Sequence, residues 1–102
     1  MSVTVITKDN YESEVNESEK TVILDFWAER CGRCKTMDST IDALASEHNE
    51  FKVGKINVDE EPALAHAFRI SGIPTVKIMK NGRVTGSATG VKSKEDILEM
   101  TK

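Results

Sequence analysis

Apolar and polar residues are distributed along the chain in a way that predicts five β-strands. The strand-like runs are residues 3–6, 21–27, 51–59, 73–80 and 83–89. The second run, TVILDFW, is nearly all apolar, as expected of a strand that is covered on both faces. The third run is less regular, because its apolar residues do not keep a strict alternation. Asn81-Gly82 favours a type I′ turn, so the last two runs should form an antiparallel hairpin.

Helical spacing occupies the segments between most of these strands. From Cys31 to about His48, one helical face is shared by Cys34, Met37, Ile41, Leu44 and Ala45. Thr7, Asp59 and Ser93 are suited to cap three shorter helices. The first of these helices carries Tyr11 and Val15, the second reaches Phe68 with Pro62 in its first turn, and the third holds Ile97 and Met100.

The order of the expected elements is β-α-β-α-β-α-β-β-α. Strands separated by helices pair in parallel through right-handed crossovers, and the final hairpin adds antiparallel pairing. The pattern therefore predicts an α/β fold, with a mixed sheet covered by helices on both faces. Because the chain has 102 residues and no linker or repeat, we expect a single domain over residues 1–102.

Composition and charge narrow the possible functions. The chain is 38% apolar and 30% charged, which is ordinary for a folded globular protein. Its net charge of -3 argues against nucleic-acid binding, which needs a basic face. No apolar run approaches the roughly 20 residues that span a bilayer, and MSVTVITKDN lacks the pattern of a signal peptide. We therefore expect a soluble cytoplasmic protein without a nucleic-acid or membrane partner.

Three uses compete for the closely spaced cysteines, Cys31 and Cys34. A structural disulfide would close a loop of four residues, which the chain-entropy relation values at only about 2 kcal/mol, and a reducing compartment disfavours it. A structural zinc site needs further ligands. The remaining candidates, His48 and His66, are separated by 17 residues rather than by an H-x3-5-H spacing, so no metal site is expected.

The third use is reversible redox chemistry. The cysteines follow a buried strand and open a helix, whose N-terminus favours a thiolate. Cys31 should be the exposed attacking thiol, and Cys34, one turn inside the helix, should be the buried thiol that resolves the mixed disulfide. Gly32 lets another backbone approach closely. The surrounding cations that add to the positive field are Arg30, Arg33 and Lys35.

The segment VILDFWAERCGRCK, residues 22–35, resembles the active-site segment of the thioredoxin family. KINVDEEP, ISGIPTVKIMKNG and the region of Gly90 resemble later sequence blocks of that family in the same order. The resemblance covers about residues 3–101. It implies the thioredoxin fold, a central mixed five-stranded sheet flanked by four helices, and the reduction of protein disulfides at Cys31 and Cys34.

The resemblance also assigns roles to further residues. Asp25 would be a buried carboxylate that exchanges a proton with Cys34, near Lys55, and burial would raise the pKa of Asp25 toward neutrality. A salt-bridged or strand-edge aspartate is the alternative. Ile73-Pro74 resembles the family's cis-proline loop, where the Ile73 backbone pairs with an extended substrate. The apolar rim around the target would consist of Trp27, Gly32, Val58, Gly72, Gly90 and Val91, although a purely structural role for Trp27 stays open.

Three positions depart from the family's usual pattern. Arg30 replaces a tryptophan, Arg33 replaces the proline of CGPC, and Ser39 replaces a proline that kinks the helix. The two arginines should favour the Cys31 thiolate and shift the reduction potential by roughly 20 mV toward the oxidising side. They can also mark a dedicated reductase with an acidic face. Local side-chain bonds from residues 38–40 can still perturb the helix at Ser39.

The main hypothesis is therefore a protein-disulfide reductase. It needs no bound cofactor, only the redox-active Cys31–Cys34 pair. By resemblance, the partners of this monomeric electron carrier are disulfide-containing target proteins and a thioredoxin reductase, a flavin enzyme fed by NADPH or ferredoxin. The alternatives are a disulfide isomerase or oxidant on the same fold, and a binding module that works without redox chemistry.

Overall fold

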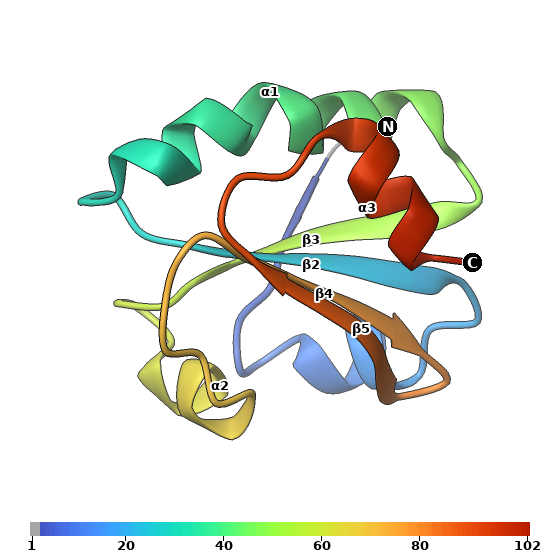
Figure 1. Ribbon diagram of the computed structural model, residues 1–102. Helices are drawn as coiled ribbons and strands as arrows, with labels where there is room; N and C mark the ends of the chain where they lie inside the picture. The colour runs from blue at the N-terminus through green and yellow to red at the C-terminus, as the bar shows by residue number, and fades with distance from the viewer. Residues whose placement is uncertain (1–2) are drawn as a thin grey trace.

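The computed structural model describes residues 3–102 (Figure 1). Its strands are β1 (Thr4–Val5), β2 (Thr21–Trp27), β3 (Phe51–Asn57), β4 (Thr75–Lys80) and β5 (Arg83–Thr89). Its helices are the π-helical segment η1 (Glu12–Asn16), α1 (Gly32–Glu47), α2 (Pro62–Ala67) and α3 (Lys94–Met100). The predicted order of strands and helices is confirmed.

The five strands form one sheet in the order β1-β3-β2-β4-β5. β3 pairs in parallel with β1 and β2, whereas β4 pairs antiparallel with both β2 and β5. Helices α1 and α3 cover one face of the sheet, and η1 and α2 lie against the other (Figure 1). The predicted α/β fold with a mixed, doubly covered sheet is confirmed.

The two covered faces explain the irregular pattern of β3. Val53 packs in the hydrophobic cluster beneath α1 and α3, and Ile56 packs in the cluster on the opposite face. Because helices cover both faces of the sheet, β3 needs no alternation of apolar and polar residues. The apolar face predicted for α1 is also confirmed, since its buried residues are Cys34, Met37, Ile41, Leu44 and Ala45.

The ends of three strands and one helix differ from the prediction. β1 covers only Thr4–Val5 rather than residues 3–6. β3 stops at Asn57, before residue 59, and β4 starts at Thr75 rather than at residue 73. The prediction that Asp59 caps α2 is wrong, because the N-cap is Glu61, which makes no side-chain capping bond. The Asn57 side-chain oxygen instead accepts a hydrogen bond from the Asp59 N–H at 2.9 Å. The Asp59 carboxylate, which follows this turn, pairs with Arg30.

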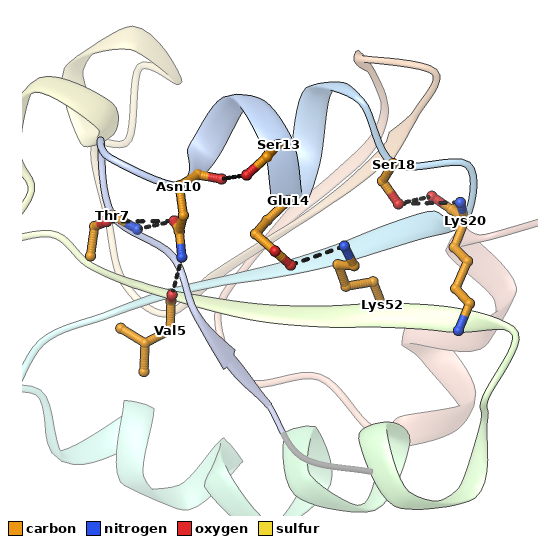
Figure 2. A network of polar contacts seen from close by, with 8 residues as sticks. All are labelled: Val5, Thr7, Asn10, Ser13, Glu14, Ser18, Lys20 and Lys52. Carbon is orange, nitrogen blue, oxygen red and sulfur yellow. Dashed lines mark hydrogen bonds and ion pairs between the residues drawn. The ribbon is translucent and has the colours of Figure 1, made fainter.

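The prediction that Thr7 caps the first helix is also wrong. η1 begins at Glu12, and its N-cap, Tyr11, makes no capping bond. The preceding turn is organised by Asn10 (Figure 2). Its side-chain oxygen accepts a hydrogen bond from the Thr7 N–H at 2.8 Å, and its side-chain nitrogen donates one to the Val5 carbonyl at 2.9 Å. One asparagine therefore connects β1 to η1.

The other predicted turn and cap are confirmed. Asn81 and Gly82 have φ angles of 53° and 77°, and a type I′ turn needs positive φ at both of its central residues. Ser93 caps α3 by accepting a hydrogen bond from the Asp96 N–H at 3.0 Å.

Helix α1 is continuous from Gly32 to Glu47. Within residues 3–102, no side chain of residues 38–40 bonds to the helix backbone, so the local perturbation expected around Ser39 is absent. The Asp38 carboxylate pairs instead with Lys55 of β3.

Candidate active site

Cys31 and Cys34 lie at the N-terminus of α1, shortly after the chain leaves β2. They are joined by a disulfide, and their Cα atoms are 5.3 Å apart. Cys31 is the N-cap of the helix, and its sulfur accepts a hydrogen bond from the Cys34 N–H at 3.1 Å. Cys31 is partly exposed, whereas Cys34 is 1% exposed. Once the disulfide is reduced, the N–H groups of the first helical turn favour a thiolate at Cys31.

The cations around the cysteines are not equivalent. Arg30 forms a two-point ion pair with Asp59, with Nε–Oδ2 and Nη2–Oδ1 distances of 3.0 Å and 3.1 Å. This hydrogen bond and the charge of Asp59 raise the pKa of Arg30, and Asp59 also offsets the positive charge of the guanidinium. Arg33 and Lys35 are exposed, and neither has an ion-pair partner within residues 3–102. Among the three cations, only Arg30 is therefore offset by an acid in the described part of the chain.

Asp25 lies within β2, and it is 1% exposed. Neither of its carboxyl oxygens has a hydrogen-bond partner among the described residues. Burial raises the pKa of Asp25 to about 7, with a lowering effect from Lys55 and a further raising effect from Asp38. Asp25 is therefore neither salt-bridged nor on an edge strand, and the shift expected from burial is confirmed. A carboxyl group with this pKa can take up or release a proton near neutral pH.

Lys55 is the direct neighbour of Asp25 across the β2–β3 ladder. Its Nζ atom lies 3.2 Å from Asp38 Oδ1 and 4.7 Å from the centroid of the Trp27 ring. Asp25 and Trp27 are two residues apart on β2, so their side chains share one face of the sheet. Asp38 reaches this face from α1, one helical turn after Cys34.

The loop before β4 approaches the strand that leads to Gly90. The Ile73–Pro74 peptide bond is cis, as the resemblance implies. The Gly90 N–H donates a hydrogen bond to the Pro74 carbonyl at 2.8 Å, and the Thr75 hydroxyl donates one to the Gly72 carbonyl at 2.6 Å. Within residues 3–102, no backbone hydrogen bond of this loop uses Ile73.

A groove of about 310 Å³ lies between this loop and Arg30. Its lining combines polar and apolar surface and consists of Arg30, Val58, Ala65, Ile70, Ser71, Gly72 and Ile73. The groove thus brings together Val58, Gly72 and Ile73 of the predicted target-binding residues. It does not include Trp27, Gly32, Pro74, Gly90 or Val91. Trp27 lines a smaller cavity of about 150 Å³ together with Lys55.

Comparison with known proteins identifies the family to which this chain belongs. The family model described as Thioredoxin matches residues 2–102. The chain belongs to the thioredoxin family. Thioredoxin from Rickettsia felis is 37% identical over 95 residues, which cover 92% of this chain and 90% of that protein. Thioredoxin from Streptomyces clavuligerus is 34% identical over 93 residues (91% and 87% covered), and that from Griffithsia pacifica is 36% identical over 99 residues (96% and 91%).

The predicted family and activity are confirmed. Thioredoxins exchange dithiols for disulfides, and this chain is a protein-disulfide reductase with a redox-active Cys31–Cys34 pair. Family membership also implies disulfide-containing targets and a partner reductase. In the part of the chain that the structure describes, no group of three or more His, Cys, Asp or Glu residues is arranged to hold a metal ion.

Among residues 3–102, every helix is too short or too polar to cross a bilayer.

Sequence reasoning missed the two acids that pair with cations of the thioredoxin site. Asp59 was expected to cap α2, and Asp38 was expected to bond locally within α1. Their partners, Arg30 and Lys55, are 29 and 17 residues away in the chain. No local spacing indicates such pairs. They depend on where β3 and the turn after it lie relative to α1 and to the loop between β2 and α1. Three further residues that line the groove were also missed, because nothing in their local sequence pattern indicated a binding role: Ala65, Ile70 and Ser71.

Proposed function

We propose that Cys31 is the attacking thiolate and Cys34 the resolving thiol in the reduction of protein disulfides. The observation that carries this proposal is the unequal exposure of the pair, since Cys31 is partly exposed and Cys34 is 1% exposed. A target disulfide can reach only the exposed sulfur. Arg33 and Lys35, together with the helix N-terminus, support the thiolate form of Cys31 and thereby tune the reduction potential.

The reaction consists of two exchange steps. In the first step, the Cys31 thiolate attacks one sulfur of the target disulfide. The Cys31–target bond forms, the target S–S bond breaks, and the second target sulfur leaves as a thiolate that takes up a proton. In the second step, the Cys34 thiolate attacks the Cys31 sulfur, the Cys31–target bond breaks, and the remaining target sulfur leaves and is protonated. Two electrons have then passed to the target, and the chain holds the Cys31–Cys34 disulfide.

Asp25 is the proposed acceptor of the Cys34 proton in the second step. Its pKa of about 7 allows the carboxylate to accept a proton at neutral pH and to return it when a reductase opens the disulfide. Lys55 is proposed to assist as the cation that lowers the pKa of Asp25 against the effect of burial. Without that cation the pKa of Asp25 would be higher, so less of the carboxyl would be ionised and free to accept a proton at neutral pH.

The target is proposed to bind as an extended segment beside the disulfide. The N–H and carbonyl of Ile73 supply main-chain hydrogen bonds to this segment, as in the addition of a strand to a sheet. The groove along Val58, Gly72 and Ile73 receives its apolar side chains. Trp27, Pro74, Gly90 and Val91 complete the contact surface in this proposal, with Gly32 allowing the close approach of the target backbone.

We also propose an electron donor, a cellular compartment and an oligomeric state for the protein. The electron donor is a flavin-containing thioredoxin reductase fed by NADPH or ferredoxin. The protein is a cytoplasmic electron carrier, acts as a monomer, and folds as a single domain over residues 1–102. A net charge of -3 supports the further proposal that neither nucleic acid nor a membrane surface is a partner.

Trapping of the mixed disulfide tests the assignment of the two thiols. Cys34→Ser should accumulate a covalent complex with a disulfide-containing target through Cys31, because the resolving thiol is missing. Cys31→Ser should accumulate none. Non-reducing electrophoresis and mass spectrometry of the linked peptides identify the bond, and added dithiol should release it.

Two outcomes would contradict the proposal. A complex formed by Cys31→Ser but not by Cys34→Ser would exchange the two roles. Full activity of a variant that carries both serine substitutions, in cells without the native protein, would favour a redox-independent binding role.

A further inference from the structure

Three charged side chains meet on the sheet face that α1 covers, and only two of them form an ion pair. Lys55 and Asp25 are direct neighbours in the β2–β3 ladder, and a buried carboxylate beside a lysine ordinarily pairs with it. The Lys55 ammonium instead lies 3.2 Å from Asp38 Oδ1. Neither oxygen of Asp25 has a hydrogen-bond partner in the described part of the chain.

The position of Asp38 explains where the ammonium is held. Asp38 lies on α1 one turn after Cys34, and its side chain is 43% exposed, compared with 20% for that of Lys55. The Lys55 ammonium also lies 4.7 Å from the centroid of the Trp27 ring, within the range of a cation–π contact. Two contacts therefore hold Lys55 toward the outer side of the site, whereas Asp25 is 1% exposed.

We propose that Asp38 is a positioning residue that holds the Lys55 ammonium against Trp27, so that Asp25 stays without an ion-pair partner and can carry a proton at neutral pH. Its importance for catalysis rests on the proposed role of Asp25 as the acceptor of the Cys34 proton. Asp38 itself contacts neither the cysteines nor the target in this scheme.

The charges that face Asp25 come from two elements. Lys55 of β3 lowers the pKa of Asp25, and Asp38 of α1 raises it, while burial has the largest effect. The neighbour of Asp25 on β4 is the apolar Val76. An opposite charge within about 4–6 Å of a carboxyl group lowers its pKa by about 1–3. If Asp38 did not hold Lys55, a direct Lys55–Asp25 ion pair would stabilise the carboxylate and leave it a poor proton acceptor.

Asp38→Asn tests the proposal through the titration of Asp25 itself. The Asp25 carboxyl carbon is followed by carbon-13 NMR in the oxidised protein, in the native chain, Asp38→Asn, Lys55→Met and the double variant. In the native background, Asp38→Asn should lower the midpoint from about 7 by about 1 pH unit or more. In the Lys55→Met background the same substitution should cause a clearly smaller fall, because only the charge of Asp38 is then lost.

Equal falls in the two backgrounds would overturn the proposal, because Asp38 would then act only as a nearby negative charge. An unchanged midpoint in Asp38→Asn would overturn it as well. Asp42→Asn is the matched control, since Asp42 is an exposed carboxylate one turn farther along α1, and it should leave the midpoint unchanged. An equal effect of Asp42→Asn would also contradict a specific role of Asp38. Lys55→Gln replaces Lys55→Met if that variant does not fold.

The pH profile of protein-disulfide reduction separates this proposal from the proposed function. If the NMR midpoint and the kinetic midpoint both fall in Asp38→Asn, both proposals are supported. If the NMR titration changes as expected but the kinetic profile does not, Asp38 positions Lys55 and the proton-transfer role of Asp25 is wrong. If the falls in NMR midpoint are equal in the two backgrounds, the positioning role is wrong and the role of Asp25 is unaffected.

Discussion

The Asp25 carboxyl is 1% exposed, and its pKa is raised from 3.8 to about 7, chiefly by burial. In the unfolded chain this group ionises near its ordinary pKa, so the folded state binds a proton more tightly than the unfolded state. Its contribution to stability is therefore fully present below about pH 4 and is lost as the pH rises through 7. Above pH 7 the folded protein bears the full cost of a buried carboxylate.

Asp25→Asn should accordingly stabilise the protein in alkaline solution. Three pKa units correspond to about 4 kcal/mol, which bounds the gain in the free energy of unfolding at pH 8. Near pH 4 the variant and the native chain should differ little, because the folded carboxyl is then neutral. Urea unfolding at both pH values measures the difference. Asp42→Asn, which changes an exposed carboxylate, is the control and should show no such pH-dependent gain.

Arg33→Pro should make the Cys31/Cys34 couple more reducing. Arg33 is exposed and has no ion-pair partner within residues 3–102, so its charge acts on the Cys31 thiolate without compensation. Removing the charge should disfavour the Cys31 thiolate and lower the reduction potential by up to about 20 mV, the shift expected from the two arginines together. Proline is tolerated in the first turn of a helix, so the fold should persist.

Equilibration with defined thiol–disulfide buffers measures that potential. Lys8→Gln removes an exposed cation outside the cysteine segment and should leave the potential unchanged. An unchanged potential in Arg33→Pro would show that Arg33 does not tune the couple.

At the scale of elements, the active site is built where two strands, one helix and one loop meet. β2 supplies Asp25, and the short connection to α1 places Cys31 at the helix N-cap. β3 lies beside β2 in parallel register and supplies Lys55. The loop before β4 supplies Ile73. The site therefore depends on the pairing of β2 with β3, and within this pairing Gly54 of β3 lies close to the side chains of Ile6 and Leu24.

Gly54→Ala tests that close approach. A Cβ atom at Gly54 would lie 2.7 Å from Ile6 Cγ1 and 3.3 Å from a terminal carbon of Leu24, so either the side chains or β1 must move. The expected loss in the free energy of unfolding is about 1–3 kcal/mol, as for other overpacked cores. Gly32→Ala is the matched control for stability, since a Cβ there meets no atom within 4 Å. Equal losses in the two variants, measured by urea unfolding, would contradict the steric explanation.

At the scale of the whole molecule, the sheet edges offer little to another chain. β1 has only two residues, and the opposite edge strand, β5, carries the exposed Arg83 and pairs with β4 through a register shift near Ile78. Short edges, charges and bulges all hinder the addition of a further strand. The exposed large apolar residues among residues 3–102 are Val5, Val84 and Val91, which lie on different segments.

The protein should therefore be a monomer in solution. Sedimentation equilibrium should give a mass of 11.3 kDa at all concentrations, and the radius of gyration should be close to the Cα value of 12.1 Å. Val84→Lys, which adds a charge to the β5 edge, should leave the mass unchanged. A mass twice as large that falls on dilution, and that Val84→Lys reduces, would show that β5 forms a dimer interface.

Patterns of short range predicted most of the fold. The nearly continuous apolar run of β2 indicated a strand covered on both faces, and the spacing of Met37, Ile41 and Leu44 indicated the buried face of α1. Asn81-Gly82 and Ser93 act within a few residues, and both were predicted correctly. Thr7 and Asp59 were not, because an amide side chain of Asn10 or Asn57 organises each of those turns.

The sequence by itself determined the order of the elements, the sheet with two covered faces, and the reactive pair at the start of a helix. These features depend on the spacing of apolar residues and on neighbours within one or two helical turns. Only the tertiary structure decided which charges meet, as in the pairs Lys55–Asp38 and Arg30–Asp59. The strand register and the placement of α1 bring their partners together across 17 and 29 residues of chain, and electrostatic effects depend on those distances.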